Sequence, residues 1–430
     1  FMNKNILLFS PFFVHLIFAE TISFPDDYES IQSAINVSVN GDSILVDPGF
    51  YSEALNFSGK EIVVSSLYII ENDSLIIGST VIDGQNNSSV ITFSNGENSA
   101  SVLQGFTLQG GIGNDEDPDG NGSFYRYGGG IYCEDSDPLV KDCIIQNNTA
   151  NEGGGGGIFC YNSSPTFSGC IISGNETDDV GGGLYSRENS SPNFFDCTFF
   201  DNTAEFGGGC YLRNESTPIF EDVIFSQNTA NNSGGGIGLK DDADLQGERI
   251  YIRNNIAEGL GGGIYINNAN PQFSFSLISD NLASSGAGVY IRNTSIVDFT
   301  NLTIANNSAS LYGNGIYVRD GIELNLLNTI VWSNGSPQVY CRSDGAEVEL
   351  NVLYSLIESG EDGVNTNDNG DLNWGNGNLN DEPYFCSSGA ENYYIRENSP
   401  CINGGSGGSL IGCFGSGCGP YNFGPVWYVD

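Results

Sequence analysis

A short alternating pattern of apolar residues recurs eight times in the middle of the chain. Each copy reads glycine, small residue, glycine, apolar, aromatic, apolar with few deviations, and the copies begin at positions 128, 155, 181, 207, 234, 261, 286 and 313. Alternation with a period of two predicts a β-strand with one buried face. The residues expected to face inward form two columns: Ile131, Ile158, Leu184, Cys210, Ile237, Ile264, Val289 and Ile316, and Cys133, Cys160, Ser186, Leu212, Leu239, Ile266, Ile291 and Val318.

A column of asparagines accompanies these strands. One asparagine follows the start of each copy after 20 or 21 residues: Asn148, Asn175, Asn202, Asn228, Asn255, Asn281, Asn307 and Asn334. A repeat of 25 to 27 residues with short strands and glycine corners predicts an all-β solenoid with three strands per turn. Leucine-rich repeats and nonapeptide calcium rolls are excluded because their motifs are absent. Asparagines stacked about 4.8 Å apart are expected to hydrogen-bond along the axis, so we interpret them as architecture.

Composition narrows the classes of function. The chain has 13 Lys and Arg against 53 Asp and Glu, a formal net charge of −40, which excludes a general nucleic-acid binder. Hydrophobic residues reach 39%, enough for a long core, so the chain is not disordered. An all-α fold is excluded because helix formers are scarce.

The N-terminus has the pattern of an export signal. Lys4 precedes an apolar run at 6–18, too short for a membrane span and typical of a signal peptide, which predicts cleavage after Ala19. A buried first strand is the alternative. The only histidine, His15, lies in this segment, so catalysis by a mature histidine is excluded and no organic cofactor is expected. We expect a secreted or cell-surface protein without a membrane span after cleavage.

The repeats, the opening FPDDYESIQSAINVSVNGDSILVDPGFYSEALNFSGKEI and the segment NDEPYF…NSPCI resemble one known group. The chain is similar to right-handed parallel β-helix repeat proteins of the pectate-lyase-like superfamily, in their secreted bacterial form rich in GGGIY. The resemblance implies an N-terminal capping helix at roughly 28–36 and a closing module at the C-terminal end. It indicates a fold rather than a function, because that fold hosts lyases, hydrolases, adhesins and surface proteins.

The resulting organisation has six segments. We expect a signal peptide at 1–19, the cap and first coils at 20–112, an acidic loop insertion at 113–127 and eight regular coils at 128–335. Closing coils and a cysteine-rich module follow at 336–423. The segment 424–430 resembles the start of a further domain, which leads to the hypothesis that the chain is a fragment.

Alternation places a second set of side chains on the outer face of the repeated strands. Tyr185, Tyr211, Tyr265, Tyr290 and Tyr317 are expected outward, and Arg187, Arg213, Arg292 and Arg319 lie two positions further on. The functional interpretation is a platform that binds polysaccharide, with aromatic faces against sugar rings and arginines on carboxylate or sulfate groups. The alternative is that the tyrosines pack along the sheet while the basic residues pair with acids such as Glu188 and Glu215.

The acidic insertion suggests a calcium site. Asp115, Asp117 and Asp119 followed by glycine match the first half of an EF-hand-like loop. The twelfth position is Arg126 rather than glutamate, so the full motif fails. The alternative is a solvated acidic loop.

The cysteines separate into ladders and a C-terminal group. Cys143, Cys170 and Cys197 share one column, as do Cys133 and Cys160, and either disulfides or buried free thiols would fit. In the C-terminal module we expect disulfides that join Cys386 to Cys401 and Cys413 to Cys418.

Catalytic groups are not evident in the sequence. A lyase would need carboxylates that hold Ca²⁺ beside an arginine or lysine base, and no acid cluster converges on Arg187 or Arg213. The first hypothesis is therefore a secreted or cell-surface scaffold or adhesin that binds an extracellular polysaccharide or cell-surface glycan without catalysis. The alternatives are a Ca²⁺-dependent polysaccharide lyase or glycoside hydrolase of the same superfamily, and a purely structural surface repeat.

Overall fold

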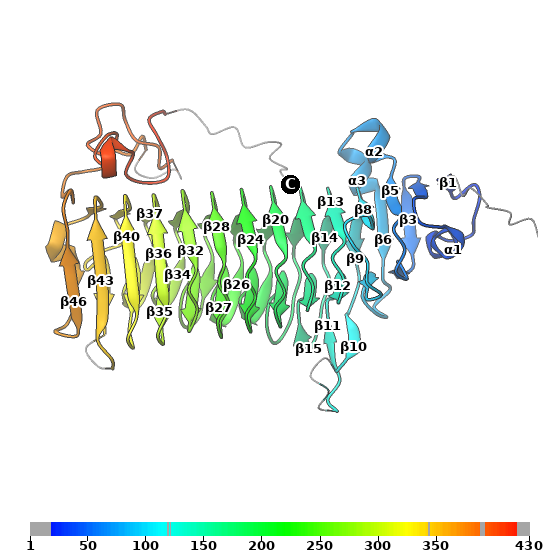
Figure 1. Ribbon diagram of the computed structural model, residues 1–430, viewed down its shortest axis with the longest axis horizontal. Helices are drawn as coiled ribbons and strands as arrows, with labels where there is room; N and C mark the ends of the chain where they lie inside the picture. The colour runs from blue at the N-terminus through cyan, green and yellow to red at the C-terminus, as the bar shows by residue number, and fades with distance from the viewer. Residues whose placement is uncertain (1–18, 118–119, 121, 343–344, 388–391, 419–430) are drawn as a thin grey trace, which may run out of the picture.

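Three parallel sheets wind around one apolar core in the computed structural model, which describes residues 19–117, 120, 122–342, 345–387 and 392–418. The turns stack along the long axis and form an elongated rod (Figure 1). This arrangement confirms the predicted all-β solenoid with three strands per turn. Residues 1–18 of the proposed signal peptide and the segment 424–430 lie outside the described residues.

The long sheet runs the whole length of the rod and has 14 strands. They are β1 (Thr21–Phe24), β2 (Ser43–Val46), β5 (Val63–Ser66), β8 (Val102–Gln104), β13 (Leu139–Lys141), β17 (Thr166–Ser168), β20 (Asn193–Phe195), β24 (Ile219–Glu221), β28 (Gln246–Glu248), β32 (Gln272–Ser274), β36 (Ile296–Thr300), β40 (Glu323–Leu327), β43 (Val348–Leu353) and β46 (Gly370–Trp374).

The glycine sheet contains the repeated glycine-apolar-aromatic strands and has 12 members. They are β4 (Leu55–Asn56), β7 (Ile91–Phe93), β12 (Ile131–Glu134), β16 (Ile158–Tyr161), β19 (Leu184–Arg187), β23 (Cys210–Arg213), β27 (Ile237–Lys240), β31 (Ile264–Asn267), β35 (Val289–Arg292), β39 (Ile316–Val318), β42 (Val339–Cys341) and β45 (Val364–Asn365).

The asparagine sheet, whose repeat strands precede the asparagine column, also has 12 strands. They are β3 (Gly49–Ser52), β6 (Thr80–Asp83), β9 (Thr107–Gln109), β14 (Ile144–Gln146), β18 (Ile171–Ser173), β21 (Thr198–Phe200), β25 (Ile224–Ser226), β29 (Tyr251–Arg253), β33 (Leu277–Ser279), β37 (Thr303–Ala305), β41 (Ile330–Trp332) and β44 (Leu356–Ile357). Two short 3₁₀ helices follow at Gly360–Gly363 and Ser406–Gly408.

A cover sheet of five strands precedes the glycine blocks along the chain. Its strands are β22 (Thr203–Phe206), β26 (Thr229–Ser233), β30 (Ile256–Ala257), β34 (Leu282–Ser285) and β38 (Ser308–Tyr312).

The core follows the predicted alternation. Both inward columns of the glycine sheet are fully buried, and phenylalanines of the other two sheets stack in register inside the same core. The ring centroids of Phe167 and Phe194 are 4.6 Å apart, and those of Phe199 and Phe225 are 4.7 Å apart. Each coil packs mainly against its two neighbours, so stability accumulates coil by coil.

The asparagine column forms the predicted ladder. Each side-chain amide nitrogen from Asn148 to Asn307 donates to the side-chain oxygen of the next asparagine, over 2.9 to 3.1 Å. All eight asparagines are buried, so the ladder supplies partners that water cannot provide there.

The N-terminal end of the core is closed by helix α1 (Ile31–Val37). Ser30 caps the helix by accepting from the Ser33 amide, which explains why the helix begins three residues later than the expected position at 28. Ile31, Ala34 and Ile35 are buried against the first coils, so the predicted capping role is confirmed. Two short helices, α2 (Tyr68–Glu71) and α3 (Leu75–Ser79), lie on the first coils.

Two additions interrupt the regular rod. The insertion at 113–127 is a projecting hairpin of β10 (Asn114–Glu116) and β11 (Tyr125–Tyr127), joined by β15 (Glu152–Gly154) (Figure 1). The C-terminal module at 379–418 folds back onto the coils. The Asn301 side chain donates to the carbonyl of Leu410 over 2.7 Å, and the Asn328 side chain accepts from the Ser406 amide over 2.8 Å.

Candidate functional site

The outward tyrosines of the glycine sheet are buried. Tyr185, Tyr211, Tyr265, Tyr290 and Tyr317 are between 2% and 7% exposed. The segments that precede the glycine blocks fold over this face, and their Val180, Phe206 and Leu260 side chains pack against the rings. The expected exposure of the tyrosines is therefore wrong, and a sugar ring has no access to them.

The arginines of the same strands are held by neighbouring groups. The ion pairs are Arg187 with Glu188 (3.3 Å), Arg213 with Asp241 (3.5 Å) and Arg319 with Asp320. The arginines also interact electrostatically with the tyrosines of the preceding coil: Arg213 with Tyr185, Arg292 with Tyr265 and Arg319 with Tyr290. The structure thus follows the alternative in which these columns pack and pair among themselves.

The acidic insertion is only partly described, because Asp119 lies outside the described residues. Asp115 pairs with Arg126 across the hairpin, with 3.4 Å between carboxylate and guanidinium, and the Asp117 carboxylate accepts from the Gly122 amide over 2.7 Å. Within the described ranges, no three His, Cys, Asp or Glu side chains are grouped closely enough to hold a metal ion. Calcium binding here stays a prediction.

The cysteine pairing in the C-terminal module differs from the expected one. Cys386 is bonded to Cys418, with their Cα atoms 5.4 Å apart, while Cys401 and Cys413 are free. The expected pairings are wrong because Cys386 and Cys418, one from each expected pair, are bonded to each other, while Cys401 and Cys413 are held in two separate hydrophobic clusters. Burial raises the pKa of the Cys401 thiol to about 11, which keeps it protonated at neutral pH. The ladder thiols Cys133, Cys143, Cys160, Cys170 and Cys197 are also free and buried.

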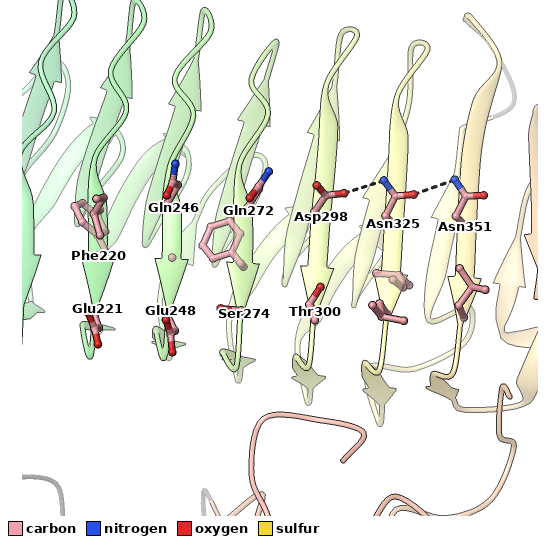
Figure 2. A pocket seen from close by; sticks show the side chains of 16 residues that line it. Phe220, Glu221, Gln246, Glu248, Gln272, Ser274, Asp298, Thr300, Asn325 and Asn351 are labelled. Carbon is pink, nitrogen blue, oxygen red and sulfur yellow. Dashed lines mark hydrogen bonds between the residues drawn. The ribbon is translucent and has the colours of Figure 1, made fainter. Parts of the chain in front are cut away.

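An open groove lies on the outer face of the long sheet. It crosses six neighbouring strands from β24 to β43 and has a volume of about 570 Å³. At a strand spacing of about 4.8 Å, six strands give a length of about 24 Å along the rod. Its outward residues form two rows (Figure 2): Ile219, Gln246, Gln272, Asp298, Asn325 and Asn351 in one, and Glu221, Glu248, Ser274, Thr300, Leu327 and Leu353 in the other.

The first row is a surface ladder of amides and one carboxylate. The Asn325 side chain donates to Asp298 over 2.8 Å, and Asn351 donates to Asn325 over 2.9 Å (Figure 2). Asn373 of the next strand extends the ladder, donating to Asn351 over 3.1 Å. Unlike the buried asparagine ladder, this one has Gln246 and Gln272 exposed at its open end. Hydrogen-bonding groups spaced by the sheet therefore face solvent along the groove.

Acidic residues flank this ladder. Glu323, Glu349 and Asp371 form a parallel column that lines a second hollow of about 470 Å³ beside the groove. Glu323 accepts from Asn325 over 3.0 Å, and Glu349 accepts from Asn351 over 3.2 Å. The carboxylates thus orient the amides of the ladder.

Arg249 neutralises acidic side chains at the end of the other row. Its guanidinium contacts the carboxylates of Glu221, Asp222 and Glu248, with 2.8 Å between Nε and the Asp222 oxygen. These hydrogen bonds, chiefly the one to Asp222, raise the pKa of Arg249. This is the acid cluster around an arginine that the sequence did not reveal, and it lies outside the predicted arginine column.

The glycine blocks do not indicate the groove residues, because these residues lie on strands of the long sheet. The missed signal is an amide or acid at 246, 272, 298, 325 and 351, spaced by 26 or 27 residues on strands that lack a glycine signature. The expected polysaccharide-binding residues and the groove lie on different faces of the rod.

A comparison with models of known protein families identifies the fold. The family model described as a right-handed β-helix region matches residues 42–277. A crystal structure of the pectate lyase Pel9A aligns with 93% of this chain and 96% of its own, at a TM-score of 0.48 and 14% identity. A tailspike receptor-binding domain of the siphovirus 9NA aligns with 96% of this chain and 79% of its own, at a TM-score of 0.22 and 13% identity. No curated protein matches the sequence. In the described part of the chain, no helix has the length and apolar character needed to cross a membrane.

Proposed function

Because the chain belongs to the right-handed β-helix family, we propose that it is an exported, non-catalytic scaffold that holds an extracellular polysaccharide in the groove of the long sheet. The observation that carries this proposal is the solvent-facing ladder Gln246, Gln272, Asp298, Asn325 and Asn351. The fixed amides of Asn325 and Asn351 donate both of their N–H groups within the sheet surface, so each offers its oxygen as an acceptor to a sugar hydroxyl with little conformational entropy to lose. The exposed amides of Gln246 and Gln272 add donors as well as acceptors.

The groove also suits the shape of a linear polymer. It is open rather than enclosed, it runs along successive coils, and its floor is rigid because each strand pairs with two neighbours. The turns that follow Thr300 and Leu327 are bordered by the C-terminal module through Asn301 and Asn328. A polymer can therefore lie along the rod, with the C-terminal module bordering one side of the groove.

The test is binding of a panel of polysaccharides by the secreted chain, measured by size exclusion with and without Ca²⁺. Asn325→Leu interrupts the ladder and is expected to weaken binding about tenfold. The matched control is Asn193→Leu, which makes the same change in the same column on β20, outside the groove. Equal binding by both variants would contradict the proposal.

One observation favours glycoside hydrolysis as a second candidate. Asp298 and Glu323 both accept from the Asn325 amide nitrogen, over 2.8 and 3.0 Å, so two carboxylates lie on either side of one groove position. Glycosidases use a pair of carboxylates. Shortening of the polymer in the same experiment, lost in both Asp298→Asn and Glu323→Gln, would establish this activity in place of simple binding.

A further inference from the structure

In ten successive coils, one turn requires an unusual backbone conformation. Between the long sheet and the asparagine sheet, the chain passes through a residue whose φ lies between 48° and 80°. Glycine, asparagine and aspartate tolerate this left-handed region, and bulky residues are rare there. The residues at this position are Gly105, Asp142, Gly169, Asp196, Asp222, Arg249, Phe275, Asn301, Asn328 and Tyr354.

Three residues at this position are not glycine, asparagine or aspartate. For two of them, contacts of the side chain can offset the cost of the left-handed backbone. Arg249 (φ 53°) makes the ion pairs with three carboxylates described above. The ring of Tyr354 (φ 48°) packs directly against Gly377 of the next coil. Phe275 (φ 49°) instead keeps 43% of its surface exposed to solvent. A strained backbone that presents an exposed aromatic ring indicates a use outside the fold itself.

The position of Phe275 connects it to the groove. It directly follows Ser274, which lines the groove on β32. On one side of it the turn is occupied by the ion-paired Arg249, and on the other side Asn301 is covered by the C-terminal module. Phe275 is thus an exposed aromatic ring at the end of β32, next to the Ser274 row of the groove and three residues from Gln272 of the ladder.

The charges of the groove restrict the class of ligand. The ionisable residues that line the two hollows are acids: Glu221, Glu248, Asp298, Glu323, Glu347, Glu349 and Asp371. Several are committed to internal bonds, to Arg249 or to the ladder amides. A polyanion would face like charges along the groove, whereas hydroxyl groups can bind the ladder without any charge.

We infer that the ligand of the groove is an uncharged polysaccharide and that Phe275 supplies the aromatic face against which one of its pyranose rings packs. This inference rests on the proposed function of the groove. The apolar face of a pyranose ring suits an exposed aromatic ring, while the hydroxyls of neighbouring sugar units of the same polymer suit the ladder amides.

The experiment measures dissociation constants by calorimetry and the thermal midpoint for the full chain and its variants. The uncharged probes are xyloglucan, galactomannan and a linear β-glucan, and the charged probes are polygalacturonate and chitosan. Phe275→Asn introduces the residue that this turn prefers. It is expected to raise Kd about tenfold while the thermal midpoint stays equal or rises. Phe275→Tyr is expected to keep Kd within about threefold, because the aromatic face remains.

The control is Phe124→Asn, which removes an exposed ring on the projecting hairpin, away from the groove. Its binding is expected to be unchanged. A lower thermal midpoint with unchanged Kd in Phe275→Asn would overturn the inference, because the ring would then serve the fold. Binding of only polygalacturonate or only chitosan by the unaltered chain would overturn the uncharged class.

Asn325→Leu separates this inference from the proposed function. If Asn325→Leu weakens binding and Phe275→Asn does not, the groove is the binding site and the role of Phe275 is refuted. If neither variant changes the binding of a polymer, or no polymer binds, the proposed function fails and the inference fails with it.

Discussion

At the scale of single residues, the buried asparagines are fully used as hydrogen-bonding groups. The Asn228 side chain donates to Asn255 and to the carbonyl of Phe199, and its oxygen accepts from the amide and the side chain of Asn202, all over 3.0 Å. A primary amide has two donors and two acceptor sites, so none of its capacity is left over. The ladder therefore fixes the register of each coil on the next.

Asn228→Ala is expected to destabilise the chain by at least about 3 kcal/mol, because it leaves several buried polar groups without a partner. The measurement is denaturant unfolding, with hydrogen exchange to locate the effect near residues 199–255. Asn232→Ala serves as the control, since Asn232 is only partly buried and donates to Glu205 over 3.2 Å. A change of less than about 0.5 kcal/mol in Asn228→Ala would contradict the architectural role.

This ladder and the inward columns could be predicted from the sequence because they depend on neighbours one repeat away. Spacing alone identifies which residues stack, and the stacking then defines the core. Phe275 could not be found in this way, since the proposed role of its side chain depends on the φ of one turn and on the exposure of the ring.

At the scale of elements, alternation predicted the direction of the tyrosines but not their exposure. Tyr185 points away from the main core, yet it is 2% exposed because Val180 and neighbouring rings pack over it. Period-two patterns distinguish the two faces of a strand and say nothing about what covers the outer face. The cover sheet arises from segments with no strong pattern of their own, so the sequence did not predict that this face is covered.

Tyr185→Ala is therefore expected to behave as a core truncation and to cost about 3 to 5 kcal/mol of unfolding free energy. Its polysaccharide binding should equal that of the unaltered chain wherever the variant is folded. Tyr185→Phe keeps the ring and loses only the buried hydroxyl, which interacts electrostatically with Arg213, so it should cost only about 1 kcal/mol. Thermal and denaturant unfolding of the two variants provide the comparison. If Tyr185→Ala left the unfolding free energy nearly unchanged, the result would support the original hypothesis that the tyrosines are exposed.

At the scale of the whole molecule, the C-terminal module joins the end of the chain to coils near its middle. Tyr393 donates to Asp280 over 2.9 Å and accepts from Asn306 over 2.9 Å, which links residues about a hundred positions apart. The Cys386–Cys418 disulfide closes the module itself and spans 32 residues. Coils of a solenoid contact mainly their neighbours, so this module adds a long-range restraint to an otherwise local fold.

Replacing both cysteines, Cys386→Ser with Cys418→Ser, is expected to loosen the module by about 3 kcal/mol and to leave the coils folded. Hydrogen exchange should increase at residues 379–418 and at the coil residues that the module contacts, 251, 277–280, 301–306 and 328–330, while residues 139–220 keep their protection. Cys413→Ser is the control, because Cys413 is free and burial raises the pKa of its thiol to about 12. Since the module borders the groove at Asn301 and Asn328, the double variant should also bind polysaccharide more weakly. Unfolding of the whole rod instead would mean that the module is required for the coils themselves, and that stability in this chain is not a sum over neighbours.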